Sequence, residues 1–277
     1  MPSADSYSVD DYEALLVALQ DVLGVVVPDE QRNELLERIK PLLLTYRLES
    51  MSSLAKCMLG DRSDARQSKI LADVLDALSQ RQMSWQLSIE ITNLLHKYIF
   101  AQLPGKAKIW VVGCGQGQLA YAVAMEVLEY ERNSGDVKNF QIVATDSSGK
   151  DIEYAESATY SESQLADLRD SYRKSYIAFN SKENNAHVKD NVSQLIEFRQ
   201  CDLKENFREL GDMDLIICPE DLVYYSNGLK MSILQQFSER LKSGGIFVTG
   251  SSQMGVGFNN GMERVEHPAG IFYRQKG

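Results

Sequence analysis

From residue 107 onward, short apolar segments alternate with longer segments of helical periodicity, and this alternation constrains the fold more than any other feature. Apolar strands separated by helices predict a mostly parallel sheet that is covered on both faces. Strands are predicted at 107–113, 140–146, 196–202, 213–219, 244–252 and 270–276, with helices at 117–133, 151–161 and 226–241. We therefore expect an α/β domain over residues 101–277.

Residues 1–100 differ from this pattern because they show only helical spacing of apolar residues, which predicts a helical subdomain. Gly24 should end the first helix, and Pro41 should kink or divide a helix over 29–48. Residues 160–195 fit the strand–helix alternation poorly. They predict an insertion with one helix, over 163–179, and a loop.

Composition excludes several classes of protein. The net charge of −10 argues against nucleic-acid binding, which requires a basic face. No apolar run approaches the roughly 18 residues of a membrane span, and the polar N-terminus resembles no targeting signal, so we expect a cytoplasmic protein. The four cysteines lie far apart, with no C-x-x-C pair, and the chain has three histidines. We therefore expect neither a metal site nor disulfides.

Three glycines at alternate positions follow the first predicted strand and precede a helix: Gly113, Gly115 and Gly117. Gln118 occupies the position of the third glycine in a dinucleotide-binding G-x-G-x-x-G loop, and no G-K-[ST] of a phosphate loop follows. G-x-G-x-G in this context is more often the loop that binds S-adenosylmethionine (SAM). The alternative is a tight turn with no ligand.

Acidic residues end the next two strands of the predicted sheet. Asp146 ends the second strand, where nucleoside-binding α/β folds place a carboxylate that accepts both ribose hydroxyls. It could instead be the N-cap of the helix that follows. Asp202 ends the third strand and is a candidate for facing the adenine amino group. The alternative for Asp202 is to cap the turn that follows it.

These landmarks, in order, resemble the chemotaxis receptor methyltransferase (CheR) family over nearly the whole chain. "KIWVVGCGQGQLAYAVAMEVLE" is similar to that family's strand–loop–helix, and "IVATDSSGKDIEYAESATYSES" is similar to its second strand and helix. "IEFRQCDL", "DLIICPEDLVYYS" and "FSERLKSGGIFVTGSSQ" resemble its later strands.

The resemblance implies a Rossmann-like, seven-stranded SAM-methyltransferase sheet behind a helical subdomain. It implies SAM as cofactor, S-adenosyl-L-homocysteine as product, and methyl-ester formation on glutamate side chains of a chemoreceptor cytoplasmic domain. Tyr224 matches the family's tyrosine whose ring lies near the transferred methyl group; the alternative is a core aromatic. The predicted cofactor-binding residues are Gly113, Cys114, Gly115, Gly117, Tyr121, Asp146, Ser147, Asp202, Leu203 and Cys218.

The sequence also departs from the family pattern. The family's polar Asn-Glu-Thr-x-Phe-Phe-Arg motif corresponds to "RQMSWQL" at 81–87, so Leu87 replaces an arginine. Gln118 and Leu119 replace paired glutamates. These losses support a second hypothesis, a SAM-binding or protein-interaction module of the same fold that no longer catalyses the reaction. A third hypothesis is a methyltransferase for another substrate.

Overall fold

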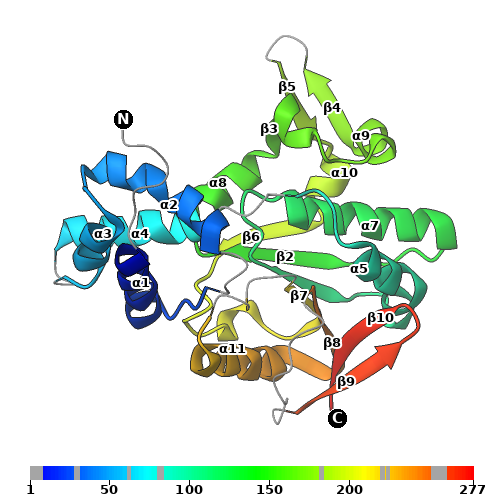
Figure 1. Cartoon of the computed structure of the whole chain (residues 1–277). Coiled ribbons are helices and arrows are strands. Elements are labelled where there is room, and N and C mark those ends of the chain that lie inside the picture. The colour runs from blue at the N-terminus through cyan, green and yellow to red at the C-terminus, as the bar shows by residue number, and fades with distance from the viewer. Residues whose placement is uncertain are drawn as a thin grey trace. The chain divides into compact units, whose positions relative to one another are not determined.

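The computed structural model describes residues 9–27, 32–60, 64–79, 84–180, 184–218, 222, 225–250 and 261–277. The chain divides into two compact units (Figure 1). The first comprises Met1–Gln82 with Leu222–Lys230, and the second comprises Met83–Asp221 with Met231–Gly277.

The first unit is helical where it is described. Its helices are α1 (Val9–Ala18), continued by the π-helical turn η1 (Leu19–Leu23), then α2 (Arg32–Tyr46), α3 (Met51–Met58) and α4 (Ala65–Ser79). Gly24 ends the first helix with φ +68°, as predicted. Pro41 lies inside α2, which continues on both sides of it, so of the two predicted effects, a kink or a division, the division does not occur. Leu15, Leu19, Ile39 and Leu54 form the centre of the unit's apolar core.

The second unit contains a seven-stranded sheet with the order β6-β2-β1-β7-β8-β10-β9. Its strands are β1 (Lys108–Val112), β2 (Gln141–Asp146), β6 (Ile196–Gln200), β7 (Met213–Cys218), β8 (Leu241–Thr249), β9 (Met262–His267) and β10 (Gly270–Gln275). Every pairing from β6 to β8 is parallel, and β10 is antiparallel to both of its neighbours. The mostly parallel sheet is therefore confirmed.

Both faces of this sheet are covered, as the apolar strands predict. Ile109 and Val111 of β1 belong to the same buried cluster as Val123 of α7 (Gln118–Ser134). Trp110, between them, contacts Phe237 of α11 (Asn227–Arg240) with 5.1 Å between ring centroids. Because neighbouring side chains of a strand point to opposite faces, α7 and α11 cover opposite sides of the sheet (Figure 1).

The insertion is a small sheet of its own, which the sequence did not reveal. A three-stranded antiparallel sheet of order β3-β5-β4 lies between α8 (Gly149–Ser157) and β6 in the chain. Its elements are β3 (Thr159–Ser161), the 3₁₀ turn η4 (Glu162–Leu165), α9 (Asp170–Tyr176), β4 (Ile177–Asn180), β5 (Asn185–Val188) and α10 (Asp190–Ser193). The predicted helix over 163–179 is thus wrong except for α9.

Candidate cofactor site

Four parallel strands of the second unit end at one edge of the sheet. Thr145 of β2 is the register partner of Val112 in β1, and Asp146 is the partner of Gln200 in β6. On the other side of β1, Val111 pairs with Ile217 of β7. Parallel pairing therefore brings the glycine loop, Asp146, Asp202 and Cys218 to the same edge, where ligands bind in open α/β sheets.

The loop at 113–117 depends on backbone conformations that side chains disfavour. Gly113, Gly115 and Gly117 all have positive φ, at +66°, +51° and +98°. A hydrogen bond of 2.9 Å from the Cys114 amide to the Thr145 carbonyl ties the loop to β2. A Cβ on Gly117 would lie 2.9 Å from the Tyr160 hydroxyl and 2.9 Å from the Ala155 Cβ. Packing inside the protein is therefore enough to require glycine at position 117.

Asp146 is held against this loop by two backbone amides. Its Oδ2 accepts a hydrogen bond from the Gly115 amide at 2.9 Å, and its Oδ1 accepts one from the Ser148 amide at 3.0 Å. Only 9% of the residue is exposed. The N-cap of α8 is Ser148, whose side chain accepts from the Asp151 amide, so Asp146 is not the N-cap of that helix.

The remaining predicted residues have different surroundings. Asp202 follows β6 and is half-buried. Its Oδ1 accepts a hydrogen bond from the Lys204 amide at 2.9 Å, so Asp202 caps the turn that follows it, which was the alternative to an adenine contact. Ser147 is exposed beside Asp146. Leu203, three residues after β6, and Cys218, the last residue of β7, are both buried. Tyr224 lies outside the described residues.

Tyr121 belongs to the packed support of the loop. Its hydroxyl donates to the Ala155 carbonyl at 2.8 Å, and its ring is buried in the main core of the unit. Burial raises the pKa of this hydroxyl, so it stays protonated as a donor.

Two residues that were not predicted from the sequence support the loop, Tyr160 directly and Trp85 through its contact with Tyr160. The Tyr160 hydroxyl, on β3 of the small sheet, donates to the Gln116 carbonyl at 2.5 Å. The Trp85 ring lies 4.8 Å from the Tyr160 ring, and its Nε1 donates to the Gln164 carbonyl at 2.7 Å. Trp85 and Leu87 are buried in the main core of the unit. These two residues therefore contribute apolar packing within the 81–87 stretch, which corresponds to the polar motif of the chemotaxis methyltransferases.

The thiol in the loop is kept neutral. Burial raises the pKa of Cys114 well above its ordinary value, and the nearby Asp146 carboxylate raises it further. A thiolate is the nucleophilic form of cysteine. The Cys114 side chain is therefore a poor nucleophile at neutral pH.

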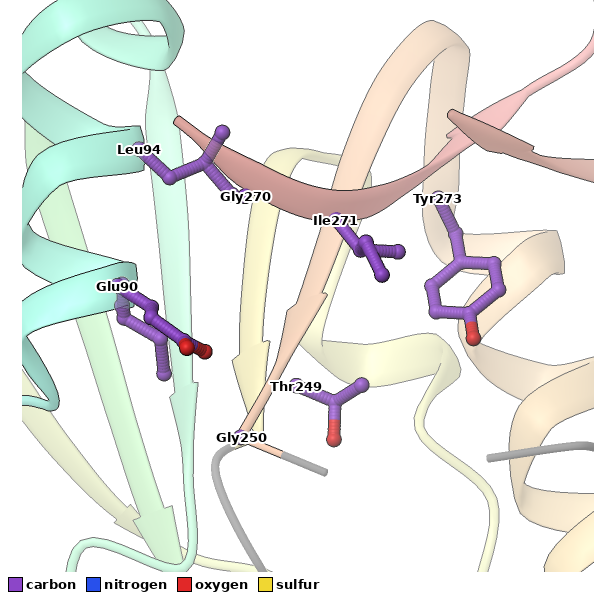
Figure 2. Close-up of a pocket in the computed structure, with 8 residues that line it drawn as sticks. Glu90, Leu94, Thr249, Gly250, Gly270, Ile271 and Tyr273 are labelled. Atoms are coloured by element: carbon purple, nitrogen blue, oxygen red, sulfur yellow. The ribbon is translucent and has the colours of Figure 1, made fainter. Parts of the chain in front are cut away.

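A pocket of about 200 Å³ lies beside this edge (Figure 2). Thr249, at the end of β8, is the register partner of Cys218 at the end of β7. The pocket therefore begins one strand away from the predicted cofactor residues. It is lined by Glu90, Ile91, Leu94, Thr249, Gly250, Gly270, Ile271 and Tyr273.

The described part of the chain offers neither a metal-ion cluster nor a membrane-spanning helix. No group of three or more His, Cys, Asp or Glu side chains there could hold a metal ion. Among the described helices, none is long and apolar enough to cross a membrane.

Comparison with known proteins agrees with the geometry of this edge. Residues 86–271 match the family model described as CheR methyltransferase, SAM binding domain. The chain is 27% identical to a chemotaxis protein methyltransferase of Vibrio anguillarum, covering 99% of this chain and 100% of that one. Chemotaxis protein methyltransferase 1 of Vibrio cholerae is 28% identical over the same shares. Chemotaxis protein methyltransferase 1 of Pseudomonas aeruginosa is 26% identical, over 96% of this chain and 98% of that one.

Proposed function

The chain belongs to the CheR methyltransferase family, and from this premise we propose that it methylates glutamate side chains of a chemoreceptor-type partner protein. It is a SAM-dependent methyltransferase of CheR type. The relatives named above are chemotaxis protein methyltransferases, which supports a protein as the methyl acceptor.

The observation that carries the proposal is the position of the Asp146 carboxylate. It lies at the carboxyl edge of the sheet, fixed by the Gly115 and Ser148 amides. A carboxylate in a fixed plane can accept hydrogen bonds from two adjacent hydroxyls. We assign Asp146 to the ribose hydroxyls of SAM and Asp202 to the adenine amino group.

The other groups at the loop fit the same cofactor. Gly113 and Gly115 bring backbone without side chains to the edge, which allows a ligand to approach closely. Gln118, the first residue of α7, is 2% exposed, and its Oε1 has no hydrogen-bond partner among the described residues. Such a buried acceptor is an expected partner for a donor of the ligand, such as the ammonium group of the methionine part.

The reaction requires little acid–base catalysis by the protein. SAM supplies a methyl group already activated on a sulfonium, and an ionised glutamate carboxylate is already a nucleophile. The residues of this chain bind SAM and the acceptor, orient the two reacting groups and exclude water. Such positioning provides most of the catalysis. The neutral Cys114 thiol does not compete for the methyl group. We place Tyr224 near the methyl group, where an electron-rich ring favours a cation.

Calorimetric titration with SAM and with its demethylated product tests the cofactor assignment. Asp146→Asn keeps the shape of the side chain and should weaken binding at least about tenfold, because the second oxygen becomes a donor. Asp136→Asn, at an exposed aspartate, is the matched control. Wild-type affinity in Asp146→Asn, or no binding by the wild type, would contradict the assignment.

Methyl transfer from radiolabelled SAM tests the acceptor. The protein is incubated with chemoreceptor cytoplasmic domains, and label should be released as methanol by mild base, because methyl esters hydrolyse there and methylated amines do not. Glutamate-to-glutamine substitution at the labelled positions should abolish incorporation. Base-stable label, or no label despite tight SAM binding, would rule out a carboxylate of these receptors as acceptor.

A further inference from the structure

The pocket in Figure 2 is formed by three elements of the second unit. Glu90, Ile91 and Leu94 come from α5 (Ile89–Leu94), Thr249 ends β8, and β10 contributes Ile271 and Tyr273. The lining therefore combines aliphatic side chains with side-chain oxygens: Ile91, Leu94 and Ile271 are aliphatic, and Glu90, Thr249 and Tyr273 can accept a hydrogen bond.

Glu90 gives this pocket its charge. It is the only ionised side chain of the lining, it is exposed, and no hydrogen bond or ion pair reaches its carboxylate from the described part of the chain. Burial raises the pKa of the Tyr273 hydroxyl, although the neighbouring Arg264 acts against this, so Tyr273 is neutral. The charge of Glu90 therefore favours a cation over a second carboxylate in this pocket.

Size and charge together point to one class of ligand. A volume of about 200 Å³ corresponds to roughly six or seven water molecules at ~30 Å³ each. This accommodates the four methylene groups and one nitrogen of a lysine side chain. Methylenes pack on apolar surface while the ammonium stays near water and a carboxylate. The formal net charge of −10 also favours the approach of a cation.

We propose that this pocket binds the end of a lysine side chain of the partner protein, with its ammonium at Glu90 and its methylenes against Ile91, Leu94 and Ile271. The pocket adjoins the cofactor edge through the Thr249–Cys218 pairing, so the lysine would lie next to the methylated residue. The identity of the partner rests on the proposed function. The preference for an alkylammonium group does not.

Methyl NMR of the full chain, labelled at Ile and Leu methyls, tests the pocket directly. The probes are Nα-acetyl-lysine N-methylamide, the norleucine analogue that lacks the amine, and the glutamate analogue. The lysine probe should shift the Ile91, Leu94 and Ile271 signals with saturation. Its apparent Kd should be about fivefold below that of the norleucine probe, the upper range for an exposed ion pair. The glutamate probe should produce no saturable shift.

Glu90→Gln should remove the preference for lysine over norleucine and leave norleucine binding unchanged. Glu153→Gln, at an exposed glutamate of α8, is the matched control and should behave as wild type. Equal affinities for lysine and norleucine in the wild type, or a lysine preference that survives Glu90→Gln, would overturn the proposal.

A methylation assay separates this inference from the function on which its partner rests. Glu90→Gln should bind SAM as the wild type does. It should raise the KM for the receptor domain that accepts the methyl group, and replacing the lysines beside the acceptor glutamate by norleucine should raise KM only in the wild type. Normal lysine-probe binding without any methylation would count against the proposed function alone. An unchanged KM in Glu90→Gln would exclude a role of the pocket in substrate recognition.

Discussion

Gly117→Ala should destabilise the second unit far more than a Gly→Ala change at the other end of the same helix. Gly117 precedes α7 with φ +98°, and Gly135 follows it with φ +70°. Alanine is strained at either position, by about 1–2 kcal/mol. The two sites differ in the space around the new methyl group.

The magnitude follows from these surroundings. A Cβ at position 117 would lie 2.9 Å from the Ala155 Cβ and 3.1 Å from the Tyr121 ring, whereas at position 135 nothing lies within 4 Å. Forcing a methyl group into packed surroundings costs about 1–3 kcal/mol more. A smaller unfolded-state entropy offsets about 0.4–1 kcal/mol at both sites. We expect losses of about 2–4 kcal/mol for Gly117→Ala and about 1 kcal/mol for Gly135→Ala.

Urea unfolding followed by tryptophan fluorescence measures both losses. The two tryptophans of the chain, Trp85 and Trp110, are buried in the second unit, so their emission reports on that unit. Gly117→Ala should also weaken SAM binding, because the clash displaces Tyr160 from the Gln116 carbonyl. Equal free-energy losses for the two variants would refute the packing argument, since they share the backbone strain and the helix.

Two further predictions concern the titratable groups of this unit. Burial alone would raise the pKa of Glu126, but hydrogen bonds from His96 and Tyr172 and the charge of Arg169 outweigh it and lower the pKa below 4.5. A depressed carboxyl pKa stabilises the fold at neutral pH, and this contribution is lost as the pH falls below about 4.5 and through the folded-state pKa. Glu126→Gln should therefore cost about 2 kcal/mol at pH 7. Its urea midpoint should converge with that of the wild type as the pH falls from about 4.5 through the folded-state pKa, and a difference independent of pH would contradict the titration. Cys114 and Cys218 are buried, so they should react with a disulfide reagent at pH 8 only after unfolding. Peptide mass spectrometry identifies the labelled cysteine. Rapid labelling of Cys114 in the native protein would contradict its burial and show that the loop is open.

The main sheet could be predicted because its strands carry their own signal. Val111 and Ile217 belong to short apolar runs that are buried on both faces, and such runs are recognisable without any tertiary information. Strand β9 escaped prediction because it is an edge strand whose first residue, Met262, is its only buried one. In β4 only Ile177 is buried, so this strand lacks the alternation that identifies a half-buried strand.

The candidate site divides in the same way. Asp146 could be predicted because its position at the end of a strand is a property of the local sequence. The supports of the loop could not, because the hydrogen bond from Trp85 to Gln164 joins residues 79 positions apart. The pocket at Glu90 could not be predicted either, because its lining residues on α5, β8 and β10 come together only in the folded unit.

The order of the strands has a consequence for the folding of this protein during its synthesis. β1 has β2 on one side, but its other neighbour, β7, ends at Cys218, and the Lys108 amide donates to Asp214 of that strand at 2.8 Å. On a ribosome adding about 5–20 residues per second, the roughly 70 residues between the ends of β2 and β7 take about 4–14 s to emerge. Throughout that interval one edge of β1 is open to pairing with another extended chain. The nascent protein is therefore exposed to misassembly at the strand that precedes its cofactor loop.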